Sequence, residues 1–312
     1  MKIFMNAIEK DLLNIVGIGN LLINEQMSCH TTFKIGGPAD IFITPTGYRM
    51  LGKVFQYVSE HHLPHLVIGK GSNLIVSDKG IRGIVISTYR MNRISYQGNL
   101  VKADSGVDLG KLSLSTAKRG LSGMEFASGI PGSVGGAVFM NAGAYEGEIS
   151  QVLKQSLILI PDSDGGKTKF RFVHLNNSEH DFSYRHSILQ DKSYIHLNSV
   201  FELTPGSKSK IEQKIDELTK TRHSKQPWGL PSAGSVFKRP EGYYTGKLIQ
   251  DCGLKGFRIG DAAVSEKHCG FIVNLGKATA GDVKAVIIHV QKTLLDRYGV
   301  LLQTEVRFIG EE

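Results

Sequence analysis

The sequence has few cysteines, and their spacing does not indicate a metal site. Cys29, Cys252 and Cys269 are an odd number, and no Cys-x-x-Cys pair occurs. Structural zinc sites take their thiolates from closely spaced pairs, so we predict that no metal is bound. Free thiols are typical of a reducing compartment, which favours a cytoplasmic location.

Long apolar runs are also missing. No stretch of about 18 or more apolar residues occurs in the 312-residue chain, and a transmembrane helix requires one. The N-terminal residues include Lys2, Glu9, Lys10 and Asp11, where a signal peptide would have its apolar centre. We therefore expect no membrane association.

Runs of like charge are absent as well. The chain has 37 Lys and Arg against 29 Asp and Glu, a net charge of +8, but no five consecutive residues share a charge sign. Nucleic-acid binders concentrate basic residues on one face or helix, so we do not predict nucleic-acid binding. A dispersed positive charge suits small anionic ligands.

What is present suits a globular protein with a large core. The apolar content is 41%, and the length allows one large domain or two to three smaller ones. Periodic apolar residues predict helices over 8–15 and 50–58, and apolar runs predict strands at 40–44, 65–68, 74–76 and 84–86. We interpret the residues up to about 90, after the leading helix, as a small βαββ layer.

The middle third is rich in strand signals, and the last third is mainly helical. Hairpins are expected at 94–103, around Gly98-Asn99, and at 157–173, around a turn over 161–166. A short helix over 109–116 and a strand over 194–201 complete that region. Helices are then predicted over 211–218, 243–252 and 279–298, the last opening on Thr279 and Asp282 and ending at Gly299.

A glycine-rich stretch over 128–143 is the strongest candidate for ligand binding. Glycine lets the backbone turn and lets a ligand approach it closely, and N–H groups in such a loop can cradle a phosphate. A second loop, Gly69–Leu74, follows the strand 65–68. Two small-residue loops after strands suit a ligand with a central diphosphate. The candidate contacts are Gly69, Gly71, Ser72, Asn73, Leu74, Gly129, Pro131, Gly132, Ser133, Gly135, Gly136, Asn141, Ala142 and Gly143.

Six motifs in order resemble the UDP-N-acetylenolpyruvoylglucosamine reductase (MurB) family. They begin at Thr31, Gly71, Gly129, Ser183, Gly234 and Thr304 and read TTFKIGGPAD, GSN, GIPGSVGGA, SYR, GSVFK and TEVRFIG. The resemblance implies an α+β fold with a two-subdomain FAD-binding region of the vanillyl-alcohol-oxidase (PCMH) type and a smaller α+β substrate-binding domain. The implied boundaries are 1–90 with the C-terminal strand 303–312, then 91–204, then 205–302.

The resemblance also implies the chemistry and the cofactors. The family are flavoenzymes that carry FAD, here expected to be non-covalent, take electrons from NADPH and reduce an enolpyruvyl ether on a UDP-sugar. Three residues match the family's catalytic positions, namely Arg185 as enolate stabiliser, Ser235 as proton donor and Glu305 as catalytic carboxylate. The 50 residues from Arg185 to Ser235 (235 − 185) are too few for the tyrosine-bearing loop of type I members, so the chain resembles type II.

The sequence indicates the substrate contacts less clearly than the cofactor contacts. Tyr184, Lys238 and Lys255 are candidate phosphate or sugar contacts, whereas His186 and His268 are interpreted as structural. The chain departs from the family pattern at three positions, with Arg239 in place of an asparagine, Asp261 in place of a glycine and Gln303 in place of a glutamate. We expect a monomer.

Three other functions remain open from sequence alone. An oxygen-using oxidase of the same superfamily would share the flavin loops but would not need the motifs at Ser235 and Glu305. A non-enzymatic flavin- or nucleotide-binding module would be expected to lose one of Arg185, Ser235 and Glu305. A nucleic-acid binder would be supported by the charge alone.

Overall fold

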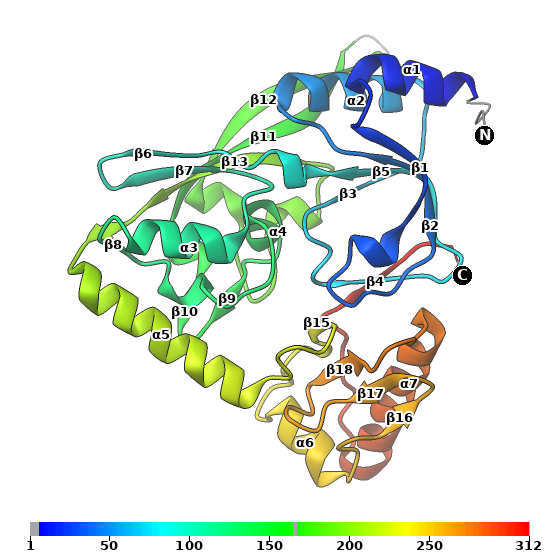
Figure 1. Cartoon of the computed structure of the whole chain (residues 1–312), viewed down its shortest axis with the longest axis vertical. Coiled ribbons are helices and arrows are strands. Elements are labelled where there is room, and N and C mark those ends of the chain that lie inside the picture. Colours follow the sequence, from blue (N-terminus) through cyan, green and yellow to red (C-terminus); the bar gives the residue numbers. More distant parts are fainter. Residues whose placement is uncertain (1–5, 165–166, 312) are drawn as a thin grey trace. The chain divides into compact units, whose positions relative to one another are not determined.

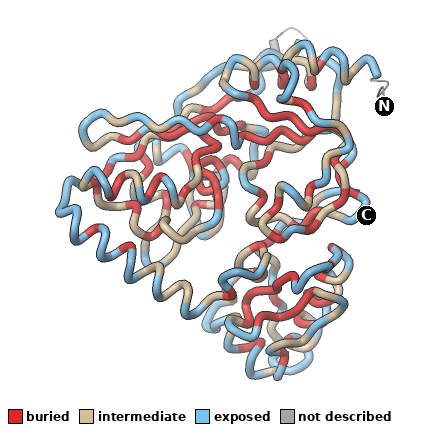
Figure 2. Tube along the Cα trace, viewed as in Figure 1, coloured by how far each residue is buried: buried red, intermediate tan, exposed pale blue. Residues whose placement is uncertain are grey.

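The structure is a computed structural model and describes residues 6–164 and 167–311. These residues form two compact units. The first unit comprises the residues up to Asn24, Asp40–Lys70 and Gly83–Thr219, and the second comprises Glu25–Ala39, Gly71–Arg82 and the residues from Lys220 onward. Each unit has its own buried apolar residues, which Figure 2 shows along the chain trace.

The first unit begins with a four-stranded sheet covered by two helices (Figure 1). A capping box between Asn6 and Glu9 starts the first helix, and both helices turn apolar residues such as Leu12 and Phe55 into a shared core. The strand order is β1-β2-β5-β3, and β3 runs parallel to β5. The elements are α1 (Ala7–Val16), β1 (Leu21–Gln26), β2 (Pro38–Ile43), α2 (Tyr48–Glu60), β3 (His65–Ile68) and β5 (Ile81–Ser87).

A five-stranded antiparallel sheet follows in the order β12-β11-β13-β7-β6. Successive side chains of a strand point to opposite faces, so one strand can serve two cores. On β11, Ile158 and Ile160 enter the core around α3 (Leu109–Ala117) and α4 (Val134–Phe139), whereas Leu159 enters the core around α1 and α2. The strands are β6 (Ile94–Gln97), β7 (Leu100–Asp104), β11 (Leu153–Asp164), β12 (Lys167–Asn176) and β13 (Ile195–Glu202).

Short elements and one long helix complete the first unit. The pairs β8–β14 and β9–β10 form two small two-stranded sheets. The long helix α5 (Lys208–Lys225) begins in the first unit and ends in the second. The remaining elements are α3 (Leu109–Ala117), β8 (Leu121–Ser122), α4 (Val134–Phe139), β9 (Gly143–Ala144), β10 (Gly147–Glu148) and β14 (Thr204–Pro205).

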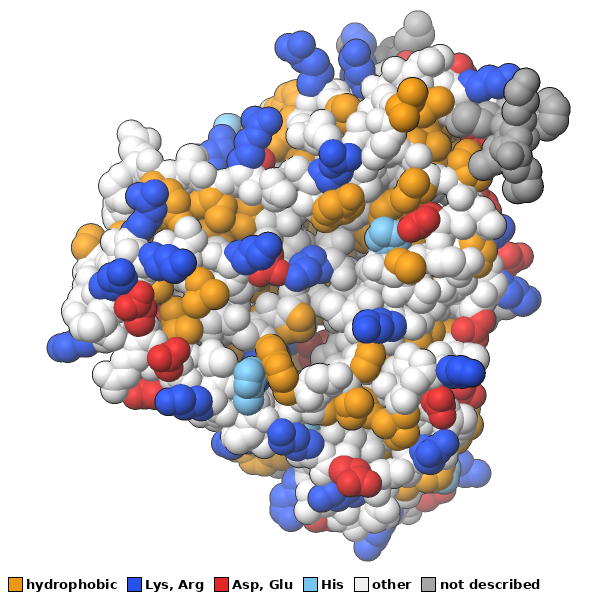
Figure 3. Space-filling view, viewed as in Figure 1, with side chains coloured by type: hydrophobic (Ala, Val, Ile, Leu, Met, Phe, Trp, Pro, Cys, Tyr) orange, Lys and Arg blue, Asp and Glu red, His pale blue; other side chains and the backbone are white. Residues whose placement is uncertain are grey.

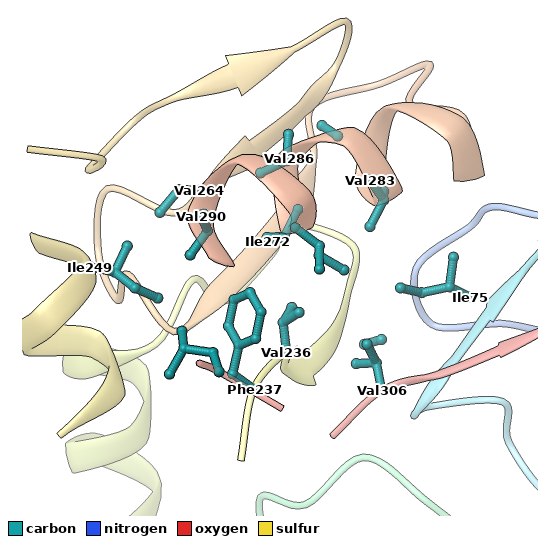
Figure 4. Packing of buried hydrophobic residues seen from close by; sticks show 14 of the residues in the cluster. Ile75, Val236, Phe237, Ile249, Val264, Ile272, Val283, Val286, Val290 and Val306 are labelled. Atoms are coloured by element: carbon teal, nitrogen blue, oxygen red, sulfur yellow. The ribbon is translucent and has the colours of Figure 1, made fainter. Parts of the chain in front are cut away.

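The second unit packs a four-stranded sheet against α7. The strand order is β15-β18-β17-β16, all antiparallel. One face of α7 carries Val283, Val286 and Val290 into a core with Ile272 and Phe237, as Figure 4 shows. The elements are β15 (Ser232–Ser235), α6 (Thr245–Asp251), β16 (Arg258–Ile259), β17 (Ala262–Val264), β18 (Phe271–Asn274) and α7 (Ala280–Tyr298).

A parallel pair joins distant parts of the chain inside the second unit. β4 (Leu74–Val76) pairs with β19 (Arg307–Ile309), with Leu74 opposite Arg307. In the turn after β4, the carboxylate of Asp78 accepts the N–H groups of Ala280 and Gly281 at 2.9 and 3.1 Å. These amides open α7, so a carboxylate there satisfies N–H groups that the helix itself cannot pair.

Several sequence predictions need correction. The βαββ layer is present as β2, α2, β3 and β5, but β4 is not part of this sheet and pairs with β19, and β1 joins the sheet as a fourth strand. The part of the predicted turn over 161–164 is strand, because β11 continues to Asp164, and residues 165–166 lie outside the described residues. Strand β1 and the four strands of the sheet β15-β18-β17-β16 were not predicted individually, and α5 is longer than the helix predicted over 211–218. The predicted capping box and C-terminal glycine of α7 are confirmed.

Candidate cofactor and substrate site

The glycine-rich stretch wraps the start of α4 in the first unit. The N–H of Gly135 donates to Ser105 O at 2.9 Å, and the N–H of Gly136 donates to Ser133 Oγ at 3.4 Å. Across the described residues, no hydrogen bond uses the N–H of Gly132 or Ser133. These two amides can therefore bind an anionic group, such as a phosphate.

Gly135 and Gly136 are neighbours in this stretch, but glycine occupies the two positions for different structural reasons. A Cβ on Gly135 would overlap Ser105 Oγ and stand 3.2 Å from His196 Nδ1, so the protein itself fills that space. A Cβ on Gly136 would have only Ser133 Oγ near it, at 3.5 Å, and Gly136 is exposed. Gly135 is thus required for packing, whereas Gly136 leaves open room outside the backbone.

The end of the stretch is anchored to the segment that carries Arg185. Asn141 is buried and adopts a φ of 39°. Its Nδ2 donates to Ser183 O at 3.1 Å, and its Oδ1 accepts the N–H of Ser150 at 3.0 Å. This asparagine therefore ties the glycine-rich stretch to the Ser183 turn.

The second predicted loop, Gly69–Leu74, is divided between the units. Gly69 belongs to the first unit, and a Cβ there would overlap Ser133 Oγ, so this end of the loop lies against the glycine-rich stretch. Gly71 belongs to the second unit, has a φ of 60°, and would overlap His30 O if it carried a Cβ. Both positions demand glycine because backbone or side-chain atoms already occupy the space.

An ion pair beside Gly69 was not anticipated from the sequence. Lys70 Nζ contacts the Asp108 carboxylate, and Asp108 also caps α3 through the N–H of Lys111 at 2.7 Å. Burial alone would raise the pKa of Asp108, but the hydrogen bonds from Lys70 and Lys111 outweigh it and lower the pKa. Asp108 is therefore a carboxylate at neutral pH.

Arg185 sits in a tight turn of the first unit. The N–H groups of Ser183 and His186 each donate to the other's carbonyl, and Arg185 has a left-handed φ of 59°. Its guanidinium approaches Gly143 O at 3.4 Å and lies 5.2 Å from the ring centre of Tyr184. Tyr184 is 56% exposed, so this candidate substrate contact is open to solvent.

Ser235 ends β15 in the second unit, immediately after a β-bulge. Ser232 pairs with Val273 and Ser235 pairs with Phe271, so β15 carries one extra residue between these positions. Gly234, with a φ of 81°, stands at the bulge. Bulges re-aim side chains and are frequent beside active sites.

Glu305 lies on the segment next to Ser235. Its N–H donates to Val236 O at 2.8 Å, and Asn73 Nδ2 donates to Glu305 O at 3.0 Å. The second unit thus brings together one proposed cofactor residue, Asn73, with two proposed catalytic residues. The implied C-terminal strand 303–312 is shorter than expected, because β19 covers only Arg307–Ile309 and Glu305 precedes it.

The candidate substrate lysines also belong to the second unit. Lys238 is half-buried, and its N–H donates to Gln303 O at 2.9 Å. Lys255 is exposed and close enough to Cys269 to lower the pKa of that thiol, although burial of Cys269 has the larger effect and raises it. Arg239, at the position that departs from the family pattern, lies over the Tyr244 ring at 4.0 Å.

The surface supports the dispersed charge expected from the sequence. On the face in Figure 3, Lys and Arg side chains alternate with acidic and apolar ones and form no single basic patch. Within the described ranges, no helix has the length and apolar character needed to cross a bilayer. Within the same residues, no three His, Cys, Asp or Glu side chains are grouped as metal ligands would be.

Comparison with known proteins identifies the class. Residues 39–163 match an FAD binding domain, and residues 226–309 match the C-terminal domain of UDP-N-acetylenolpyruvoylglucosamine reductase. The chain is thus an FAD-dependent oxidoreductase with an α+β fold.

The particular family follows from likeness over nearly the whole length. The chain is 47% identical over 293 residues to the UDP-N-acetylenolpyruvoylglucosamine reductase of Clostridium perfringens, covering 94% of each chain. It is 49% identical to that of Pediococcus pentosaceus, covering 94% of this chain and 95% of the relative. The crystal structure of the Thermus caldophilus reductase superposes with a TM-score of 0.76 at 33% identity, covering 92% and 97%. The chain belongs to the UDP-N-acetylenolpyruvoylglucosamine reductase family.

Proposed function

We propose that the chain reduces the enolpyruvyl ether of UDP-N-acetylglucosamine enolpyruvate to UDP-N-acetylmuramate, a step of peptidoglycan precursor synthesis, with NADPH as electron donor. The family membership supports the substrate. The observation that carries the chemistry is that Ser235 and Glu305 lie on adjacent segments, joined by the 2.8 Å bond from Glu305 N–H to Val236 O. We further propose that the enzyme works in the cytoplasm as a monomer.

The glycine-rich stretch fits non-covalent FAD. The available N–H groups of Gly132 and Ser133 and the open space at Gly136 suit a diphosphate. No His or Cys, the residues that attach flavins covalently, lies within 69–74 or 128–143. The proposed cofactor contacts are Gly69, Gly71, Ser72, Asn73, Leu74, Gly129, Pro131, Gly132, Ser133, Gly135, Gly136, Asn141, Ala142 and Gly143. We also propose that the chain has three domains, with boundaries after residues 90, 204 and 302.

The reaction adds a hydride to the β-carbon of the enolpyruvyl group and a proton to its α-carbon. Bound FAD, once reduced by NADPH, supplies the hydride. Ser235 Oγ donates the proton, and the alkoxide left behind is reprotonated from solvent. A serine is a weak acid, but the α-carbon is a strong base once the β-carbon has received the hydride, so transfer is favourable when the hydroxyl is held in place.

Two ionisable residues are proposed to stabilise the enolate. The Arg185 guanidinium grips the substrate carboxylate with two parallel donors and stabilises negative charge as it develops. Glu305 assists as a hydrogen-bonding carboxyl group beside Ser235. Tyr184, Lys238 and Lys255 are proposed contacts to the UDP-sugar, whose phosphates suit the two lysines.

The test separates the two half-reactions. In Ser235→Ala, stopped-flow bleaching of the flavin by NADPH should match the wild type, because no proton is delivered to substrate in that step. Reoxidation by the enolpyruvyl substrate should slow by about 10²–10⁴-fold, the range of a positioned general acid.

Ser232→Ala, on the same strand β15, is the matched control and should leave both steps unchanged. Equal slowing of both half-reactions would show that Ser235 only shapes the pocket. Rapid reoxidation by oxygen, with none by the enolpyruvyl substrate, would instead identify an oxidase.

A further inference from the structure

The turn that precedes β18 places a histidine beside Ser235. Ser265 Oγ accepts the N–H groups of Lys267 and His268 at 3.1 and 3.2 Å. The N–H of Phe271 donates to His268 O at 2.9 Å. The backbone of the turn is therefore held at both ends, and the direction of the His268 side chain is fixed with it.

The His268 ring is itself anchored. Its Nδ1 accepts the N–H of Gly270 at 3.2 Å, and the ring meets Phe271 edge-on at 5.1 Å between centroids. Burial lowers the pKa of His268, which favours the neutral ring. Because Nδ1 is the acceptor, the neutral ring carries its proton on Nε2.

Gly270 is the point where this ring and the Ser235 hydroxyl meet. A Cβ on Gly270 would stand 3.0 Å from His268 Cε1, 3.1 Å from His268 Nδ1 and 3.4 Å from Ser235 Oγ. The Val236 N–H donates to Gly270 O at 2.9 Å, which fixes Gly270 against the residue after Ser235. The absence of a side chain at Gly270 lets the ring and the hydroxyl flank the same position.

We propose that His268 is a positioning residue that holds the hydroxyl of Ser235 in its proton-donating orientation. The inference rests on the proposed function of Ser235. A serine side chain has three staggered rotamers, and its neighbours decide which one is populated. The anchored ring occupies the space beside Gly270, so it excludes rotamers of Ser235 that would turn toward β18. A misplacement of about 1 Å can cost on the order of 10²-fold in rate.

The experiment compares His268→Leu with His268→Asn in the full-length, flavin-loaded protein. Leucine fills space but cannot accept the Gly270 N–H. Asparagine can accept it through Oδ1, which takes the place of Nδ1. We expect His268→Leu to slow reoxidation by UDP-N-acetylglucosamine enolpyruvate by about 10- to 100-fold, to leave reduction by NADPH unchanged, and His268→Asn to restore most of the rate. His289→Leu is the matched control. His289 lies on α7, and its ring stacks on Phe257 with 4.1 Å between the ring centroids.

A double variant distinguishes positioning from general damage. With Ser235 already replaced by Ala, His268→Leu should slow reoxidation no further, because there is no hydroxyl left to orient. Independent effects of the two substitutions, or equal slowing of both half-reactions in His268→Leu, would overturn the inference alone. An unchanged reoxidation rate in Ser235→Ala would overturn both the inference and the proposed role of Ser235.

Discussion

The two units hold their proposed functional groups in different ways. In the first unit, strain is concentrated around the Ser183 turn. Of the eight non-glycine residues with positive φ in the described chain, five lie between positions 141 and 185: Asn141, Tyr145, Glu146, Asp181 and Arg185. In the second unit, Ser235 and Glu305 lie on extended segments whose backbone groups pair with each other's neighbours.

Buried polar groups show a similar contrast. His180 is fully buried with neither ring nitrogen hydrogen-bonded, and His196 Nδ1 is also buried without a partner. In the second unit the Nε2 of His223 is the corresponding case among the described residues, while the buried Asn274 side chain accepts the N–H groups of Gly276 and Ala278. Unpaired buried polar groups and left-handed residues each cost free energy. More of these groups lie in the first unit, near the proposed cofactor and Arg185 sites, than in the second.

The largest expected effect tests whether the glycine-rich stretch binds the cofactor. Gly136→Val adds its side chain to open, exposed space, so the fold should persist while the bound FAD is mostly lost. The measurement is the flavin-to-protein ratio of the purified variant. Gly52→Val, at an equally open position on α2, should keep its flavin.

A full flavin complement in Gly136→Val would place the diphosphate away from this loop. Gly135→Val is not an informative alternative. Its side chain would collide with Ser105 and His196, so it would damage the fold whether or not a cofactor binds there.

The second-largest effect is expected when Arg185 is replaced, and it tests whether the backbone strain at this residue serves function. Arg185→Gly should lower kcat by about 10²-fold or more, because the donor for the enolate is removed. The same change should raise the free energy of unfolding by up to about 1 kcal/mol, because glycine adopts a φ of 59° without steric cost. Urea denaturation and steady-state kinetics measure the two changes.

Asp181→Gly is the matched control for Arg185→Gly. Asp181 has a φ of 48° in the same segment and is not a proposed site residue, so its replacement should raise stability without a loss of activity. If Arg185→Gly lowers stability as well as activity, the left-handed turn is not a source of strain and the contrast between the units is weakened.

The smallest effect on activity is expected at the buried histidine stacked on Phe182. Burial lowers the pKa of His180 from 6.5 to about 4, so the folded protein keeps it neutral where the unfolded chain takes up a proton. Its contribution to stability is complete above pH 6.5 and is lost as the pH falls toward 4, at up to about 1.4 kcal/mol per pH unit. His180→Phe should make this part of the stability profile flatter.

Urea denaturation between pH 7 and 4.5 measures the slope. His61→Phe, which alters an exposed ring stacked on Tyr57, should leave the slope as in the wild type. An unchanged slope in His180→Phe would mean that His180 does not control acid stability.

Local signals in the sequence were reliable, and pairings between distant segments were not. Thr279, Asp282 and Gly299 define both ends of α7 because capping depends only on nearby residues. The C-terminal strand was expected over 303–312, but β19 covers only Arg307–Ile309, because its pairing with β4 sets its extent. The strands of the second unit are two to four residues long, too short for a periodic pattern.

The site shows the same division. The motifs around Arg185, Ser235 and Glu305 could be matched in the sequence, but the geometry that links them to their neighbours could not. His268 was interpreted as structural, and only the register of β15 on β18 brings its turn beside Ser235. Likewise, the sequence could not show that Gly135 is needed for packing and Gly136 is not. That difference depends on Ser105 and His196, which come from other segments of the chain.

The interleaving of the second unit has a consequence for synthesis. Its core contains Phe33 and Ile75 together with residues from Ala233 to Val306. β4 can pair only after β19 has been made. During translation, the first unit can collapse around its own sheets while the early segments of the second remain unpaired. Such delayed, non-local pairing slows folding and leaves apolar strands exposed to chaperones and to other nascent chains. The unit that is proposed to deliver the proton is therefore the unit in which one strand pair forms only after residues 307–309 have been made.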